Sequence, residues 1–355
     1  MIRNTYELLR RFKTSFFEKR NVKQFTSHLN LERKLPKLTR QEKEAIKALY
    51  KKYSIPLNPD YRNYRLLYHV NGMFSEKYIS NDLFRSIIEP RLNSRKFKFA
   101  WADKNMADKI IPKEFTARTI LHNMNGQYYD HLYNPISIET AFGILEKERD
   151  YVIKKAIETA SGKGVFHITN ADEMRKAIDL MKGSDFIVQE RINQHPQLKF
   201  FNETSVNIVR VITLCLADRS PVVLSGTLRV GAKGYFTDNF IDEKYRGMTV
   251  VGVKHNGQLM DKAYFASGER NREFEKLIAE KEIPDYSKMC ELVIKLHKSL
   301  PYFGIVGWDV TIDDHSNIKI LEYNINAIGI LYYQYAHGAL FGDYTEDVLK
   351  QVFID

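Results

Sequence analysis

Cysteine is scarce in this sequence, with only Cys215 and Cys290 among 355 residues. Two thiols are too few for a disulfide framework or for a zinc site made of cysteine ligands, and this scarcity fits a protein of a reducing compartment. The sequence has no run of about 18 apolar residues, which excludes a membrane-spanning helix. The first residues also lack the apolar core and the small-residue cleavage site of a secretory signal. We therefore expect a cytoplasmic protein.

Several familiar catalytic and nucleotide-binding motifs are absent as well. The chain contains no GxxxxGKS, GxxxxGKT or GxGxxG stretch, so the two best-known phosphate loops are missing. The ten histidines show no HExxH or paired ligand spacing, and we assign none of them to catalysis. There is no GxSxG elbow, and neither cysteine stands in the signature of a nucleophile. Covalent hydrolases are therefore disfavoured.

The composition is that of a soluble globular protein with one or two domains, because 44% of the residues are hydrophobic, 28% charged and 12% aromatic. The formal net charge is +10, and residues 1–52 contain 15 Lys or Arg against 5 Asp or Glu, whereas the two signs balance in the remainder. Any contact with a polyanion therefore belongs to this basic lead segment, and we expect no nucleic acid partner for the body.

Residues 1–24 have the pattern of an amphipathic helix. Aromatic and aliphatic residues recur at roughly helical spacing with basic residues between them, at Tyr6, Leu8, Leu9, Phe12, Phe16 and Phe17 and at Arg10, Arg11, Lys13, Lys19 and Arg20. A basic face beside Phe and Leu is typical of a helix on an anionic leaflet, where each cation near the surface contributes about 1 kcal/mol. The plainer interpretation is a helix that packs on the body with its cations in water. Both remain open at this point, the first implying a peripheral location at the inner face of the membrane.

Further short helices are expected. Residues 41–53, within the lead segment, have the composition of a charged surface helix, and a helix of the body is expected over 81–88, ending before Pro90. Residues 102–111 indicate another short helix, and residues 115–119 a strand.

The middle of the chain predicts a small sheet covered by a helix. Ser137 is a plausible N-cap for a helix over 139–148, and Asn170 with Glu173 makes a capping-box pattern before a helix that ends at Gly183. Strands are expected at 150–158, 164–168 and 186–192. This order of strand, glycine-containing turn, strand, helix and strand does not describe a doubly wound nucleotide fold.

The last part of the chain is rich in strands. They are expected at 205–217, 221–231, 248–253, 304–313 and 318–324, with helices at 271–281, 287–299 and 329–340. Neighbouring strands joined by short polar turns indicate antiparallel hairpins. The fold class is therefore α+β, with two sheets.

The strongest chemical pattern lies in the hairpin WDVTIDDHSNIKILEYNIN. Its turn places Asp309 and Glu322 nearly opposite one another, and Asn324 follows two residues after Glu322, on the same face of the strand. Carboxylate and amide oxygens suit Mg²⁺, which would offset the repulsion between the two acids. The alternative is a solvated hairpin with scattered acids, although the apolar neighbours suggest that these acids lie near a core, where they need partners.

Two further groups of residues suit an anionic ligand. The run Ser161, Gly162, Lys163 and Gly164 follows a strand that ends in Lys154 and Lys155; glycines let backbone N–H groups approach phosphate oxygens, and a lysine supplies charge. By itself this run is equally the pattern of an ordinary hairpin turn. Arginines on apolar strands need anionic partners, and the chain has Asn207, Arg210 and Arg229 in such strands. Structural salt bridges are as good an explanation of these arginines.

Taken in order, these pieces resemble the ATP-grasp superfamily, and most closely its sugar-transfer-associated branch, which occurs with bacterial polysaccharide synthesis genes. The resemblance runs from about residue 99 to 330 and leaves residues 1–60 outside. FAWADKNMADKII resembles the first ATP-contacting segment, with Lys104, and DYVIKK the second lysine strand, with Lys154. ASGKGV resembles the glycine-rich loop over the phosphates. FIVQERI resembles the hinge strand, whose backbone would hold the adenine at Gln189, Glu190, Arg191 and Ile192.

The resemblance implies two α+β subdomains that grip ATP and Mg²⁺, with Asp309, Glu322 and Asn324 as the metal ligands. It implies an ATP-dependent, ADP-forming ligase that activates a carboxylate as an acyl phosphate for attack by an amine, with Arg210, Arg229 and Asn207 at the transferred group. The substrates would be a small molecule or sugar acid and an amine acceptor of capsule or exopolysaccharide synthesis. The expected division is a basic helical lead at 1–60, a preceding region at 61–130, a lid subdomain at 131–200 and a large subdomain at 201–355.

Two alternatives to the ligase remain. Members of this superfamily also phosphorylate hydroxyl groups, so a phosphotransferase acting on a sugar or another hydroxyl acceptor would use the same residues. The basic lead instead suggests a non-catalytic protein that binds nucleotides or polyanions at a membrane surface.

Overall fold

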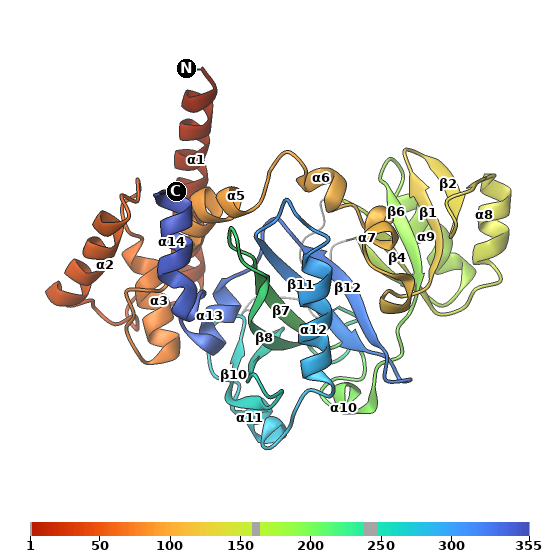
Figure 1. The fold of residues 1–355 in the computed structure, drawn as a ribbon. Helices are drawn as coiled ribbons and strands as arrows, with labels where there is room; N and C mark the ends of the chain where they lie inside the picture. The colour runs from red at the N-terminus through yellow and green to blue at the C-terminus, as the bar shows by residue number, and fades with distance from the viewer. Residues whose placement is uncertain (1, 158–163, 238–246, 355) are drawn as a thin grey trace.

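The computed structural model describes residues 2–157, 164–237 and 247–354, and it begins with helices that lie to one side of two sheets (Figure 1). The lead segment is helical, as predicted, and the helices of this part are α1 (Ile2–His28), α2 (Arg40–Lys52), α3 (Tyr61–Asn71), α4 (Asn81–Leu83), the π-helical turn η1 (Phe84–Ile88) and α5 (Glu89–Leu92). A capping box starts α2, because Thr39 Oγ1 accepts from the Glu42 N–H at 3.1 Å and Glu42 Oε2 accepts from the Thr39 N–H at 2.7 Å.

The prediction that the helix over 81–88 ends before Pro90 is wrong. The chain stays helical from Asn81 to Leu92, and Pro90 lies in the first turn of α5, where its missing N–H costs no helical hydrogen bond. The π-helical turn η1 directly before it is wider than an α-helical turn, and the helix continues through Pro90 without a break. Such turns are rare and are frequent at functional sites.

The first sheet has six antiparallel strands in the order β3-β2-β1-β6-β4-β5. They are β1 (Thr119–Met124), β2 (Gln127–Asp130), β3 (Pro135–Ile136), β4 (Tyr151–Lys155), β5 (Val165–Ile168) and β6 (Phe186–Glu190). Helices α8 (Ile138–Leu145) and α9 (Ala171–Leu180) pack on it around one apolar core. The strand predicted at 115–119 begins only at Thr119, because residues before it form the turn η3 (Lys113–Phe115).

The predicted helix caps of this sheet are present. Ser137 Oγ accepts from the Thr140 N–H at 3.1 Å, and Asn170 Oδ1 accepts from the Glu173 N–H at 3.0 Å. The carboxylate of Glu173 reaches back to the Thr169 N–H at 2.7 Å, one residue before the capping residue. These bonds fix the first turns of α8 and α9, the helices that connect β3 to β4 and β5 to β6.

The second sheet also has six antiparallel strands, in the order β10-β9-β8-β7-β11-β12. They are β7 (Ile208–Leu214), β8 (Val222–Val230), β9 (Thr249–Val253), β10 (Leu259–Phe265), β11 (Ile305–Ile312) and β12 (Ile318–Asn324). Its helices are α11 (Arg272–Ile278), α12 (Tyr286–His297), α13 (Leu331–His337) and α14 (Thr345–Phe353). Strand β10 and helix α14 are additions to the predicted elements, whereas the α+β class with two sheets is confirmed.

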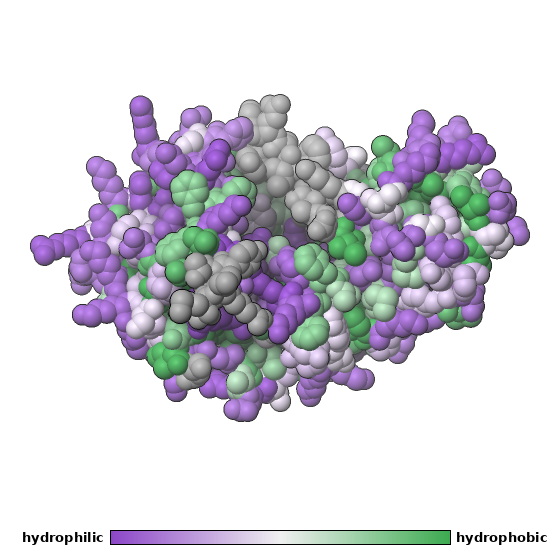
Figure 2. Space-filling view, turned by 90° about the horizontal axis from the view of Figure 1, so that it is seen from above, coloured by the Kyte–Doolittle hydropathy of each residue, from purple (hydrophilic) through white to green (hydrophobic). Residues whose placement is uncertain are grey.

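Short helical turns connect these parts: α6 (Lys98–Trp101), η2 (Lys104–Met106), α7 (Ala107–Ile110), α10 (Pro196–Lys199) and η4 (Gly342–Tyr344). The chain segment 102–111 is thus helical, as expected, but as two short pieces. Among the described residues, no helix is long and apolar enough to cross a membrane. The surface seen from above is mostly hydrophilic, with small hydrophobic groups (Figure 2).

The packing suggests a different division of the chain from the one expected. Strands β1 and β2 (residues 119–130) pair within the first sheet, although the expected boundary falls after them, at 130. The early helices share a core with the end of the chain, where Leu67 and Phe84 belong to the same apolar cluster as Tyr335 and Leu349. We therefore propose a lid subdomain at about 113–192, with the early helices packed on the large subdomain.

Candidate active site

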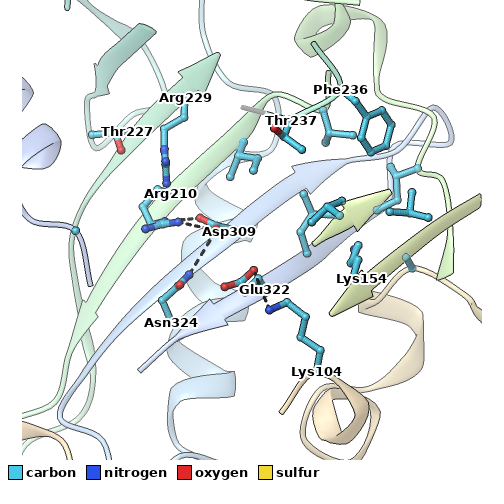
Figure 3. A pocket seen from close by; sticks show the side chains of 18 of the residues that line it. Lys104, Lys154, Arg210, Thr227, Arg229, Phe236, Thr237, Asp309, Glu322 and Asn324 are labelled. Atoms are coloured by element: carbon cyan, nitrogen blue, oxygen red, sulfur yellow. Dashed lines mark hydrogen bonds and ion pairs between the residues drawn. The ribbon is translucent and has the colours of Figure 1, made fainter. Parts of the chain in front are cut away.

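A cleft of about 510 Å³ lies between the two sheets and contains most of the residues singled out from the sequence (Figure 3). The second sheet forms one wall with Arg210, Asp309 and Glu322, and the first sheet forms the other with Lys154. Lys104 enters from the segment before the first sheet. The cleft therefore joins residues more than 200 positions apart in the chain.

Four polar side chains form a row across the wall of the second sheet. Thr227 on β8 is paired with Arg210 on β7, Arg210 with Asp309 on β11, and Asp309 with Glu322 on β12. Directly paired residues of antiparallel strands point to the same face, so all four side chains point to the cleft.

The centre of the row is an ion pair between Arg210 and Asp309. Arg210 donates through Nε to Asp309 Oδ1 and through Nη2 to Asp309 Oδ2, the latter at 2.6 Å. The Asp309 side chain is only 7% exposed and that of Arg210 13% exposed. A forked pair of this kind is the geometry in which a guanidinium best balances a nearly buried carboxylate. Asp309 is thus a nearly buried acid with an ion-pair partner, as its apolar neighbours in the sequence indicated.

The other two predicted metal ligands flank Asp309. Glu322 is about one-third exposed, and its Oε2 lies 3.6 Å from Lys104 Nζ. Asn324 donates through Nδ2 to Asp309 Oδ2 at 3.4 Å. The structure therefore brings Asp309, Glu322 and Asn324 to one side of the cleft, as Figure 3 shows.

A nearly buried pair of lysines stands opposite the acids. Lys154 Nζ donates to Gln189 Oε1 at 3.1 Å, and the Lys104 N–H donates to the Ala156 carbonyl at 3.1 Å, which ties the Lys104 segment to the end of β4. Burial, with the nearby Lys104 ammonium, lowers the pKa of Lys154 to about 8, and the Glu322 carboxylate opposes this shift. Two ammonium groups that face the same cleft suit a polyanionic ligand.

The far end of the cleft is apolar and is closed by the hinge strand. Glu190, Arg191 and Ile192 line it together with the apolar side chains of Ala117, Val152, Val165 and Leu321. Arg191 is held by Asp150, with Nη1 3.3 Å from Oδ2. Apolar side chains at one end and cations at the other give the cleft the polarity of a nucleotide, with a base at one end and phosphates at the other.

The predicted phosphate loop is described only in part. Ser161, Gly162 and Lys163 lie outside the described residues. Gly164 has φ of +76°, and a Cβ there would lie 3.0 Å from Lys155 Cβ, so this position requires glycine. The Gly164 carbonyl accepts from the Lys155 N–H at 2.8 Å, which closes the β4–β5 turn.

Asn207 and Arg229 differ in their places. Asn207 is fully buried away from the cleft, and its Nδ2 donates at 2.8 Å each to Gln194 Oε1 and to the carbonyls of Leu198 and Asn202. These bonds hold the chain before β7, and a catalytic role for Asn207 stays a prediction. Arg229 does line the cleft, two residues from Thr227 on the same face of β8.

Some lining residues carried no signal in the sequence. Arg85 reaches the cleft from the π-helical turn η1, and its Nη1 lies 3.3 Å from Glu89 Oε2. Glu89 is buried, and its Oε1 accepts from the Ile328 N–H at 2.8 Å. One glutamate thus fixes both Arg85 and the loop after β12. An arginine within an unremarkable helical stretch gave no reason to expect this position.

The comparisons with known proteins decide the family. A family model described as sugar-transfer associated ATP-grasp matches residues 83–348, which is most of the chain. The chain belongs to the sugar-transfer associated ATP-grasp family. This membership supports binding of ATP in the cleft and an ATP-dependent enzyme. A comparison with curated proteins gives no match.

Solved structures of ATP-grasp enzymes resemble this family member. The VanG D-Ala:D-Ser ligase from Enterococcus faecalis is 15% identical with a TM-score of 0.43, and the match covers 71% of this chain and 60% of that one. The N5-carboxyaminoimidazole synthetase from Staphylococcus aureus, complexed with ADP, is 10% identical with a TM-score of 0.41, covering 66% and 47%. A biotin carboxylase from Campylobacter jejuni is 12% identical with a TM-score of 0.42, covering 71% and 46%. The chain thus spans about half the length of these proteins.

Proposed function

We propose that this protein is an ATP-dependent carboxylate–amine ligase that works through an acyl phosphate, acting on a sugar acid or amino acid in bacterial capsule or exopolysaccharide synthesis. One observation carries the proposal. The cross-strand row of Arg210, Asp309 and Glu322 faces Lys104 and Lys154 across one cleft, in a chain of the sugar-transfer associated ATP-grasp family.

The two ends of the cleft give ATP one orientation. Its adenine would occupy the apolar end, against Ile192 and the backbone of residues 189–192, and its phosphates would lie between Lys104 and Lys154. Cations that are already in place stabilise the charge that develops in phosphoryl transfer without further reorganisation. The protein's contribution is therefore positioning and charge neutralisation.

The acids of the row are proposed to hold Mg²⁺. Asp309, Glu322 and Asn324 offer two carboxylates and an amide on one face, which is the set of hard oxygen ligands that magnesium takes. When bound there, the ion would screen phosphate charge and polarise the transferred group. Arg210 engages both oxygens of Asp309 in this structure, so a metal ligand role for Asp309 requires Arg210 to give up one of them.

The arginines are proposed to act on the transferred phosphoryl group. Arg210, released in part from Asp309, and Arg229 beside it line the end of the cleft beyond the lysines. A carboxylate oxygen of the substrate would form a bond to the γ-phosphorus as the bond to ADP breaks. The neutral amine would then form a bond to the acyl carbon as phosphate leaves, and its proton would pass to water or to the leaving phosphate. Guanidinium forks suit the phosphate oxygens in both steps.

The acids of the cleft favour a carboxylate over a hydroxyl as the nucleophile. Among the described lining residues, Asp309 pairs with Arg210, Glu322 with Lys104 and Glu190 with Arg118. A hydroxyl must lose its proton to a base before or during attack, whereas a carboxylate is already ionised. These acids are better placed as ligands and partners than as a base for the attack on the γ-phosphorus. The ligase is preferred to a phosphotransferase because its carboxylate needs no base in that step.

The test is to incubate the protein with ATP and magnesium and a panel of sugar acids and amino acids, each with amine acceptors, and to quantify ADP, phosphate and products by mass. The ligase predicts equal amounts of ADP, phosphate and amide, and none of them with the Asp309→Asn/Glu322→Gln variant. A phosphorylated product with no free phosphate would establish the phosphotransferase instead. Nucleotide binding without any turnover across the panel would favour the non-catalytic alternative.

A further inference from the structure

The outer face of α1 is apolar and basic at the same time. Five large side chains of this helix are between 48% and 71% exposed, namely Leu8, Leu9, Phe12, Phe16 and Phe17. Lys13, Arg20 and Lys23 are exposed among them. Residues spaced by three and four positions share one side of a helix, so Leu9, Phe12, Phe16 and Phe17 form with these cations a single face, called here the outer face of α1. Leu8 lies at the edge of this face, seven residues before Ser15.

The side of α1 next to the outer face packs on the protein. Ser15 and Val22 are buried there, and Ser15 Oγ donates to Asp82 Oδ2 at 3.0 Å. Lys19 Nζ lies 3.4 Å from Asp82 Oδ2 and donates to the Asn58 carbonyl at 2.7 Å. The helix is therefore held in one orientation, and its outer face is presented to solvent as a fixed surface. Figure 1 shows that its N-terminal half projects away from the rest of the molecule.

Both acids of the helix lie off the outer face. Glu7 pairs with Arg10 at 2.9 Å, and Glu18 is partly buried near Arg85. A groove beside Glu7, on that same side of α1, is lined by the basic residues Arg10, Arg11, Arg91, Arg95 and Lys96. The cations of the outer face itself are Lys13, Arg20 and Lys23, and neither acid of the helix lies among them.

We propose that the outer face of α1 binds an anionic lipid bilayer, with its Phe and Leu side chains in the headgroup and acyl boundary and its cations on the lipid phosphates. Apolar side chains flanked by cations are the pattern of a helix that lies in a membrane interface. A second copy of this chain fits the face poorly, because docking would bring two sets of cations together. A nucleic acid would leave the five apolar side chains without a matching surface. This inference is independent of the ligase activity.

The experiment is cosedimentation of the full chain with vesicles of phosphatidylglycerol and phosphatidylcholine, and with vesicles of phosphatidylcholine alone. Binding is expected only to the anionic vesicles and is expected to weaken with added salt. The variant Lys13→Gln/Arg20→Gln/Lys23→Gln should bind about 100-fold more weakly, from about fivefold for each cation. The variant Phe12→Ser/Phe16→Ser should lose about as much affinity, because it removes two large apolar side chains that the bilayer would bury.

Two control variants separate this face from general charge and hydrophobicity. Lys147→Gln/Lys176→Gln/Lys295→Gln removes the same charge from exposed positions far from α1, and Leu180→Ser/Leu277→Ser removes two exposed leucines elsewhere. Both should bind anionic vesicles like the wild type. All variants should keep the wild-type unfolding midpoint, since the changed side chains are exposed.

Three results would overturn the proposal. The first is no binding to anionic vesicles by the wild type. The second is a dimer in light scattering that the Phe12→Ser/Phe16→Ser variant abolishes, since the face would then be a contact between copies. The third is binding to nucleic acid or to vesicles that falls with the cation variant and is unchanged in Phe12→Ser/Phe16→Ser, since the apolar side chains would then have no part.

Discussion

The substitution Lys154→Met should make the protein more stable at pH 7 while it weakens ATP binding. The Lys154 side chain is half-buried in the cleft, and this burial together with the Lys104 ammonium lowers its pKa from 10.5 to about 8, so the folded state disfavours the charged form. A shift of this size corresponds to about 3 kcal/mol at pH 7. Methionine keeps the length of the side chain without the charge, and the lost bond to Gln189 costs about 1 kcal/mol. The net gain is about 2 kcal/mol, or roughly 2–3 °C in the unfolding midpoint of a chain of this size.

The pH dependence gives a second readout of the same effect. The unfolded chain binds more protons at Lys154 than the folded chain between pH 8 and 10.5, so the stability of the wild type rises with pH across this window. Between pH 7 and pH 9 the wild type should therefore gain about 1 kcal/mol relative to Lys154→Met. Phosphate oxygens would favour the charged lysine, so ATP affinity of the wild type should fall as pH rises above about 8.

Thermal unfolding at several pH values, with and without Mg-ATP, measures all of these quantities. Lys154→Gln is the matched control, because it is also uncharged but leaves a polar group in the same place. The reasoning is refuted if Lys154→Met is less stable than the wild type at pH 7 and binds ATP equally well, since Lys154 would then be a structural group with an ordinary charge state.

The remaining predictions concern the row, the turn and a buried amide. Asp309→Asn should destabilise the unliganded protein by about 3 kcal/mol, since it leaves the Arg210 guanidinium without its carboxylate. A double-mutant cycle with Arg210→Met should show strong coupling in urea unfolding, and additive effects would contradict the ion pair. Gly164→Ala should cost about 1 kcal/mol and weaken ATP binding, because φ is +76° there; unchanged values for both in calorimetry would exclude a strained turn. Asn207→Ala should destabilise by about 2 kcal/mol but leave the KM for ATP unchanged; a raised KM with normal stability would return Asn207 to the site.

The row of the second sheet could be predicted from the sequence because strand geometry is simple. The polar turn places Asp309 near Glu322, and the period of two puts Glu322 and Asn324 on one face, so the three residues could be grouped without a structure. Their exact pairing could not be predicted, because a bulge between Asp309 and Val310 shifts the register by one residue from the pairing of Ile312 with Ile318 at the turn. The partner of Asp309 could not be predicted. Arg210 belongs to a strand about a hundred residues earlier, and only the order of strands in the sheet brings β7 beside β11.

The misses have a common physical cause. Arg85 lies in the cleft because buried Glu89 holds it there, and Glu89 is placed by packing between distant segments that no local pattern reveals. The helix through Pro90 was missed for a related reason, since a π-helical turn has no simple sequence pattern. Asn207 was ambiguous in the sequence because a polar residue on an apolar strand can serve a ligand or the backbone, and only the packing shows its bonds to Gln194, Leu198 and Asn202.

The central claim, a magnesium-dependent ATP site built on the row of acids, is tested most directly by one measurement. The unfolding midpoint is recorded with ATP alone and with Mg-ATP, for the wild type and for Asp309→Asn/Glu322→Gln. A ligand at one hundred times its dissociation constant adds about 2.7 kcal/mol to the stability. We predict a shift for the wild type that needs magnesium and that the double variant loses. An equal shift in both proteins, or no shift with any nucleotide, would contradict the account.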